Sequence, residues 1–118
     1  GTRTASITGG FVALALACNR LVAAGKLPRS PIASQVAAIS IGILDGEVRL
    51  DLPYAEDSVA DVDLNLVMTD ADRIVEVQGT AEHSAFSRAE LERMYDVGAE
   101  GIRQLFAIQQ SVLQRGLA

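Results

Sequence analysis

The chain has 118 residues, of which 49% are hydrophobic and 21% are charged. This composition excludes an intrinsically disordered protein and indicates one compact domain with a modest core. The net charge of −5 argues against a self-contained RNA-binding surface, because contacts to phosphate need lysine and arginine.

Three further features narrow the class of protein. No apolar run reaches the roughly 20 residues that a membrane span needs, so we expect no membrane contact. The single Cys18 excludes an internal disulfide, which suits a reducing compartment, and its apolar surroundings predict a small core residue. The chain opens without a signal peptide or an initiator methionine, so we expect a piece of a longer protein.

The first predicted element is a helix from Thr4 to Ala24. Its apolar residues wrap around much of the helix, so we expect it to be largely buried. Gly25 stands where a left-handed helix end is expected, and the loop Leu27–Pro31 contains two prolines that end the helix.

Two strands follow. The apolar run Gln35–Leu44 predicts a central strand that is covered on both faces. Asp45 and Gly46 predict a hairpin turn in which both residues take positive φ. Glu47–Leu52 alternates between apolar and polar residues, as a strand with one buried face does.

The segment Pro53–Ala60 is polar and turn-like. A third strand, Asp61–Thr69, has an apolar face opposite a polar one that carries Asp61, Asp63 and Asn65. A fourth strand is predicted over Arg73–Gln78 and a loop over Gly79–Phe86.

The last predicted element is a helix that begins with a capping box, in which Ser87 is the N-cap and Glu90 reaches back. Gly98 and Gly101 lie inside it and indicate close packing against the sheet, and Gly116 is a natural stop. We therefore predict a single domain over residues 1–118, an α+β fold with a four-stranded mixed sheet packed against two helices on one face.

The first candidate site is Gly1-Thr2-Arg3-Thr4 at the start of the first helix. A helix N-terminus attracts anions, glycine lets the backbone approach them, and arginine offers a planar fork for phosphate oxygens. An exposed helix start with a threonine cap explains the same residues.

The second candidate site is acidic. Asp57 precedes the third strand and can fold back beside Asp63, which lies on that strand's polar face. Two close carboxylates hold Mg²⁺ or raise the pKa of one partner, which then serves as a general acid. A solvated sheet face is the alternative. Glu76 and Gln78 share a face of the fourth strand and are candidates to border the same cleft, whereas the lone His83 predicts no zinc site.

At these same places the sequence resembles the ribonuclease PH family. The resemblance runs essentially end to end and rests on several long motifs in one register. The stretch EVQGTAE, Glu76–Glu82, favours ribonuclease PH over polynucleotide phosphorylase. The other matching segments are Gly1–Gly9, Val36–Gly42, Glu56–Ser58, Asp63–Thr69 and Phe86–Arg88.

The resemblance implies the carboxyl-terminal half of a ribonuclease PH-type fold, with the amino-terminal half and its basic RNA-binding surface absent. It implies a cytoplasmic, phosphate-dependent 3′-to-5′ exoribonuclease, a tRNA nucleotidyltransferase. Such an enzyme trims tRNA precursors and other RNA 3′ ends, releases nucleoside diphosphates and forms a homo-hexamer, a trimer of dimers. By the same resemblance, Gly1, Thr2 and Arg3 would bind inorganic phosphate, and Asp57 and Asp63 would be catalytic and linked to Mg²⁺.

Two other hypotheses remain open at this point. The chain can be a catalytically silent scaffold or RNA-binding subunit of the same fold, although a scaffold has no need of Arg3, Asp57 and Asp63. It can also be a plain α+β interaction domain, against which the series of motif matches argues.

Overall fold

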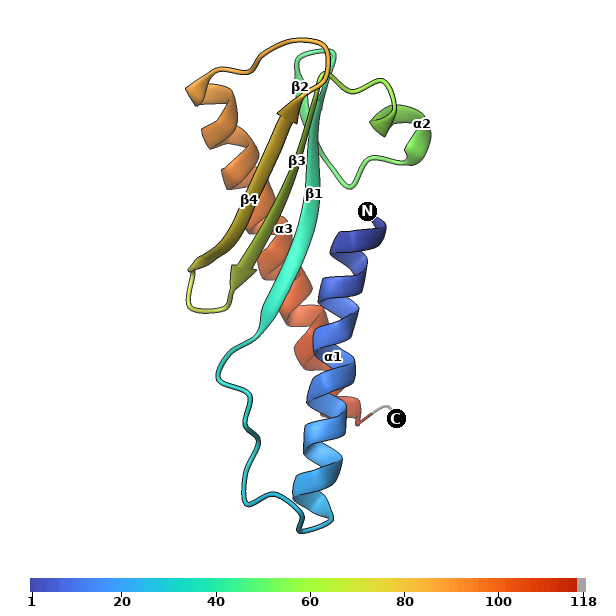
Figure 1. Cartoon of the computed structure of the whole chain (residues 1–118), viewed down its shortest axis with the longest axis vertical. Coiled ribbons are helices and arrows are strands. Elements are labelled where there is room, and N and C mark those ends of the chain that lie inside the picture. The colour runs from blue at the N-terminus through green and yellow to red at the C-terminus, as the bar shows by residue number, and fades with distance from the viewer. Residues whose placement is uncertain (117–118) are drawn as a thin grey trace.

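The computed structural model describes residues 1–116, apart from the side chain of Tyr54. The molecule is elongated, with extents of 54 × 26 × 18 Å, and α3 crosses behind the sheet while α1 stands at its side (Figure 1). In chain order the elements are α1 (Thr2–Ala23), β1 (Val36–Leu44), β2 (Glu47–Leu50), α2 (Tyr54–Asp57), β3 (Val62–Thr69), β4 (Ile74–Ala81) and α3 (Arg88–Arg115).

The sheet has four strands in the order β2-β1-β3-β4. Every pairing is antiparallel, so the α+β class is confirmed but the prediction of a mixed sheet is wrong. The β1–β2 and β3–β4 pairs are joined by short turns and are therefore antiparallel, since a parallel pair would need a long crossover. The predicted turn is confirmed, with φ of 52° at Asp45 and 77° at Gly46.

The two helices lie on different sides of the sheet, which corrects the expectation that both cover one face. On α3, added Cβ atoms at Gly98 and Gly101 would lie 2.7 Å from Ile41 Cδ1 and 2.6 Å from Ile39 Cδ1. The predicted close packing of these glycines is thereby confirmed. The residue between those isoleucines, Ser40, faces α1 instead. The prediction that β1 is covered on both faces is also confirmed.

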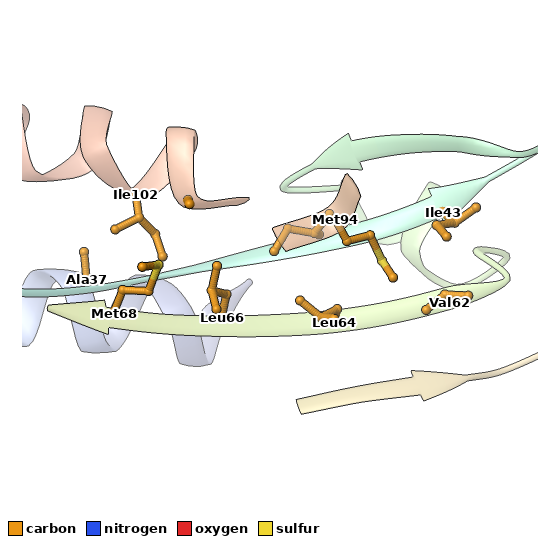
Figure 2. Close-up of a cluster of buried hydrophobic side chains, with 10 residues drawn as sticks. Ala37, Ile43, Val62, Leu64, Leu66, Met68, Met94 and Ile102 are labelled. Atoms are coloured by element: carbon orange, nitrogen blue, oxygen red, sulfur yellow. The ribbon is translucent and has the colours of Figure 1, made fainter. Parts of the chain in front are cut away.

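The core lies between α3 and the apolar face of the sheet. Figure 2 shows Met94 and Ile102 of α3 pointing toward side chains of β1 and β3. The α3 capping box at Ser87 and Glu90 is confirmed, and so is the stop at Gly116, whose φ is 63°. The β3 residues of this core are Val62, Leu64, Leu66 and Met68, as the alternation predicts.

Helix α1 closes the open edge of β1. Strand β2 pairs only with Ile41–Leu44, which leaves backbone groups of Ala38 without a strand partner. Thr8 Oγ1 takes their place, accepting from Ala38 N at 3.1 Å and donating to Ala38 O at 3.2 Å. Gln109 on α3 donates to Val36 O at 3.0 Å and to Thr8 O at 3.1 Å, so α1, α3 and β1 are joined at one point.

The prediction that α1 is largely buried is wrong within residues 1–116. Its buried residues form one stripe, Thr4, Phe11, Ala15 and Cys18, and α1 packs mainly on β1 and α3. Leu14 is 58% exposed. By length and composition α1 is long and apolar enough to cross a membrane, although no uninterrupted apolar run in the sequence is. Core helices of soluble proteins meet the same criteria. The helix end at Gly25 is confirmed, with φ of 74°.

Other differences from the prediction are local. Strand β2 ends at Leu50 rather than Leu52, because Asp51 takes a φ of 50° and turns Leu52 onto the opposite face, against Gly42. The polar segment after it contains the single-turn helix α2. Strand β4 continues to Ala81, through residues predicted as loop, because it pairs with β3 over that length.

Candidate functional site

A polar hollow of about 200 Å³ lies where the N-terminus of α1 meets the polar face of β3. It contains all the residues predicted for the site, from both the phosphate-binding segment and the acidic pair. The lining residues are Gly1, Thr2, Arg3, Thr4, Ser40, Asp57, Asp63 and Asn65. Residues 62 positions apart in the sequence therefore face the same space.

The start of α1 suits an anion. Gly1 is the N-cap, and no side chain caps the first turn, which also contains no acidic residue. The Thr4 hydroxyl donates to Gly1 O at 2.9 Å and so leaves the first-turn N–H groups free to bind a ligand. Those groups and the helix dipole favour negative charge. A Cβ at position 1 would lie 3.1 Å from Asp51 Oδ1, so a larger residue there would crowd that side chain.

The polar side chains of β1 and β3 form the floor of the hollow. Gly42 pairs with Asp63, and Ser40 pairs with Asn65. The Ser40 hydroxyl donates to Asn65 Oδ1 at 3.1 Å and lies 3.4 Å from Thr4 Oγ1. The space over Gly42 is filled by Leu52, whose Cδ1 an added Cβ would meet.

The contribution of Ser40 to this floor was not predicted from the sequence. The available signal was a lone hydroxyl inside an apolar strand. Asp61 was predicted to share the polar face, but it lies before β3 and lines neither this hollow nor the neighbouring one.

Asp57 ends α2 and meets Asp63 from the other side of the hollow. Both carboxylates also line a second hollow of about 340 Å³, which adds Ser58, Glu82 and His83. The two hollows thus adjoin at the acidic pair. Glu82 and His83 were not predicted here, because their approach depends on the extension of β4 along β3.

The Asp63 carboxyl has a raised pKa. Burial is the largest cause, followed by the negative charges of Asp57 and Glu82. A half-buried carboxyl beside other carboxyls holds its proton more tightly than an exposed one. Asp63 is therefore the carboxyl in this hollow that is best suited to give a proton to a leaving group.

Arg3 extends from α1 across the polar face of the sheet to the edge strand β4. Its Nη2 donates to Glu76 Oε1 on β4 at 2.5 Å. Glu76 and Gln78 were predicted to border the cleft, but neither lines the hollows. Glu76 reaches the site only through its hydrogen bond with Arg3.

The acidic pair fits a hydrated Mg²⁺ ion but not a full protein cage. Asp57 and Asp63 supply two carboxylates, and Mg²⁺ binds through one or two carboxylates while it keeps several waters. Within residues 1–116 no group of three or more His, Cys, Asp or Glu side chains is arranged to hold a metal. Cys18 is buried, as predicted.

A larger hollow of about 410 Å³ lies elsewhere, between β4 and α3. Its lining is mainly apolar and includes Leu64, Leu66 and Val77. It offers no cluster of donors for an anion, so the smaller polar hollow is the candidate site.

Comparison with known proteins gives a consistent result. Residues 34–101 match the family described as "3′ exoribonuclease family, domain 2". Ribonuclease PH of Cyanothece sp. is 57% identical over 113 residues, which are 96% of this chain and 47% of that protein. Ribonuclease PH of Corynebacterium glutamicum is 55% identical over 113 residues, 96% of this chain and 46% of that protein.

A solved structure shares the fold. Rice (Oryza sativa) Rrp46 superposes with a TM-score of 0.61 at 24% identity, over 86% of this chain and 46% of that one. The chain thus spans about half the length of the relatives that it matches.

Proposed function

The chain belongs to the 3′ exoribonuclease family of ribonuclease PH, and on that premise we propose that it contributes the chemical centre of a phosphate-dependent 3′-to-5′ exoribonuclease. One observation carries the proposal: the anion-binding start of α1 and the acidic face of β3 open onto the same hollow. The substrates are the 3′ ends of RNA, tRNA precursors among them, and the products are nucleoside diphosphates.

In this proposal Gly1, Thr2 and Arg3 hold inorganic phosphate in the hollow. A phosphate oxygen attacks the phosphorus of the terminal phosphodiester, and the bond to the 3′-oxygen of the preceding nucleotide breaks. The attacking phosphate becomes the β-phosphate of the released nucleoside diphosphate. Holding two anions close together is the main task of the site, so positioning and charge neutralisation supply most of the acceleration.

The departing 3′-oxygen needs a proton, and Asp63 is the proposed donor. Its raised pKa keeps a larger protonated fraction near neutral pH than an ordinary aspartate has. After the transfer Asp63 is a carboxylate and regains its proton from solvent. Asp57 supports this role, since its charge is one of the causes of the raised pKa.

We also propose that Mg²⁺ binds at Asp57, and at Asp63 when that carboxyl is ionised. When bound, the ion would neutralise charge on the phosphate groups. Asp57 is the more exposed of the two residues and so the easier one to reach for a hydrated ion.

The net charge of −5 requires basic groups from outside this chain to bind RNA. We propose that an amino-terminal half supplies them and covers the exposed apolar face of α1, where Leu14 and Leu21 are 58% and 41% exposed. The proposal includes a homo-hexameric ring of three dimers in the cytoplasm.

The test uses the protein expressed from its complete gene and a tRNA with extra 3′ nucleotides. We expect release of nucleoside diphosphates only when phosphate is present. Arg3→Ala should weaken the use of phosphate by about 1.5–3 kcal/mol, the range for a hydrogen bond to a charged group. Asp63→Asn should abolish turnover and leave assembly intact.

The scaffold hypothesis makes the opposite prediction. A silent subunit would assemble into rings and show no turnover in any phosphate concentration. Full activity of Asp63→Asn would remove the proposed role of that residue.

A further inference from the structure

The phosphate-binding arginine has a partner that the proposed chemistry does not use. Arg3 of α1 donates from Nη2 to Glu76 Oε1 of β4. Strands β1 and β3 lie between α1 and β4 in the sheet, so the Arg3 side chain extends across their polar face. The two side chains are half-exposed, at 52% for Arg3 and 37% for Glu76.

A β-bulge aims Glu76 at this face. Ile74 pairs with Met68, but the next pair is Glu76 with Val67, so Val75 is an extra residue in β4. Counted from Ile74 at the turn, strict alternation would place Glu76 on the face that α3 covers, and the extra residue Val75 places it on the polar face instead, together with Gln78. Bulges of this kind commonly redirect a side chain next to a site.

The contact leaves most of the guanidinium free. A single hydrogen bond, from Nη2 to Oε1, joins the pair, whereas a guanidinium carries five donors. Arg3 lines the hollow and Glu76 does not. The carboxylate therefore holds the arginine from outside the space that the phosphate would enter.

We propose that Glu76 is a positioning residue, which holds Arg3 extended over the hollow so that its remaining donors meet the phosphate. A free arginine side chain loses rotamer freedom when it binds an anion, and a side chain that is already held loses less. The negative charge of Glu76 acts in the opposite sense, but solvent screens it because the pair is half-exposed. This inference rests on the proposed function and adds a residue to it.

Glu76→Gln tests the inference, because it keeps an acceptor of the same shape and removes the charge. The KM for inorganic phosphate should rise about 1.4- to 5-fold, the range expected from exposed ion pairs, with kcat nearly unchanged. Glu76→Ala should raise it at least as much. The matched control is Glu100→Gln, which removes the charge of the exposed Glu100–Arg103 pair on α3 and should change neither constant.

A double-mutant cycle separates positioning from a general effect on the fold. In an Arg3→Ala background, Glu76→Gln should no longer change KM, because the side chain that it holds is gone. A lowered KM in Glu76→Gln would instead show that Glu76 competes with phosphate, and an unchanged KM would show that it has no role. Either result overturns the inference.

Calorimetric titration with inorganic phosphate, without RNA, distinguishes this failure from failure of the proposed function. If the unaltered protein binds no phosphate, the proposed function fails. If it binds phosphate and Glu76→Gln binds equally well, only the role of Glu76 is refuted.

Discussion

Replacing Gln109 by leucine is expected to destabilise the protein by about 2–3 kcal/mol. Gln109 is 1% exposed and makes three hydrogen bonds at the point where α3, α1 and β1 meet. Its amide nitrogen donates to Thr8 O and Val36 O, and its Oε1 accepts from Gln35 Nε2 at 3.0 Å. Leucine has a similar size and can make none of these bonds.

The magnitude follows from those contacts. Three hydrogen bonds at about 1 kcal/mol each give about 3 kcal/mol. The Val36 carbonyl, at the open edge of β1, would lose the partner that Gln109 provides. The additional apolar surface of leucine offsets part of this loss, on the order of 1 kcal/mol. Gln35 loses its bond to Gln109 but keeps the one to Phe106 O, so its amide is not left without a partner.

Urea-induced unfolding, followed by circular dichroism, measures the free energy of unfolding of the protein expressed from its complete gene. The matched control is Gln110→Leu, a neighbour that is exposed and should change stability by less than about 0.5 kcal/mol. Equal stabilities of the two variants would refute the view that Gln109 joins the helices to the edge of the sheet.

Three other variants give further tests. Asp63→Asn should raise the melting temperature at neutral pH, because a raised pKa means that ionised Asp63 destabilises the folded state. The gain should shrink as the pH falls through the folded-state pKa toward about 3.9, where the carboxyl is increasingly protonated in both the folded and the unfolded state. A gain in melting temperature that does not depend on pH would contradict this cause. Gly98→Ala should cost about 1–3 kcal/mol in a denaturant titration, since the new Cβ would meet Ile41, and a stabilised variant would contradict the close packing. Ser87→Ala should cost about 1 kcal/mol in the same assay through loss of the α3 cap, whereas no change would show that the capping box contributes nothing.

The parts of the fold that depend on local patterns were predictable from the sequence. The alternation in β3 predicted that Asp63 and Asn65 lie opposite the core, because side chains change face at every residue. The Asp45-Gly46 turn and the capping box at Ser87 also follow from short-range chemistry. These features do not depend on which helix or strand packs beside them.

The errors arose where a neighbour decides the outcome. Nothing local in Gly79–Ala81 indicates a strand, and it forms because β3 offers a partner along its whole length. The bulge at Val75 has the same origin, and without it the contact between Glu76 and Arg3 is not predictable. The exposure of α1 depends on what covers Leu14, and this chain does not cover it.

Local sequence patterns identify the two pieces of the candidate site, whereas their meeting is a property of the fold. Asp57 and Asp63 are close in the sequence, but Arg3 joins them only because α1 docks through Thr8 on the open edge of β1. The polar floor from Ser40 is a consequence of the same docking.

The most direct test of the account is the origin of the oxygen atoms in the product. The protein expressed from its complete gene is given a tRNA with extra 3′ nucleotides and oxygen-18-labelled inorganic phosphate, and the released nucleotides are analysed by mass spectrometry. The account predicts nucleoside diphosphates with a labelled β-phosphate, at a rate that falls strongly in Arg3→Ala. Unlabelled nucleoside monophosphates, released equally fast without phosphate, would show that water is the attacking group and would contradict the account.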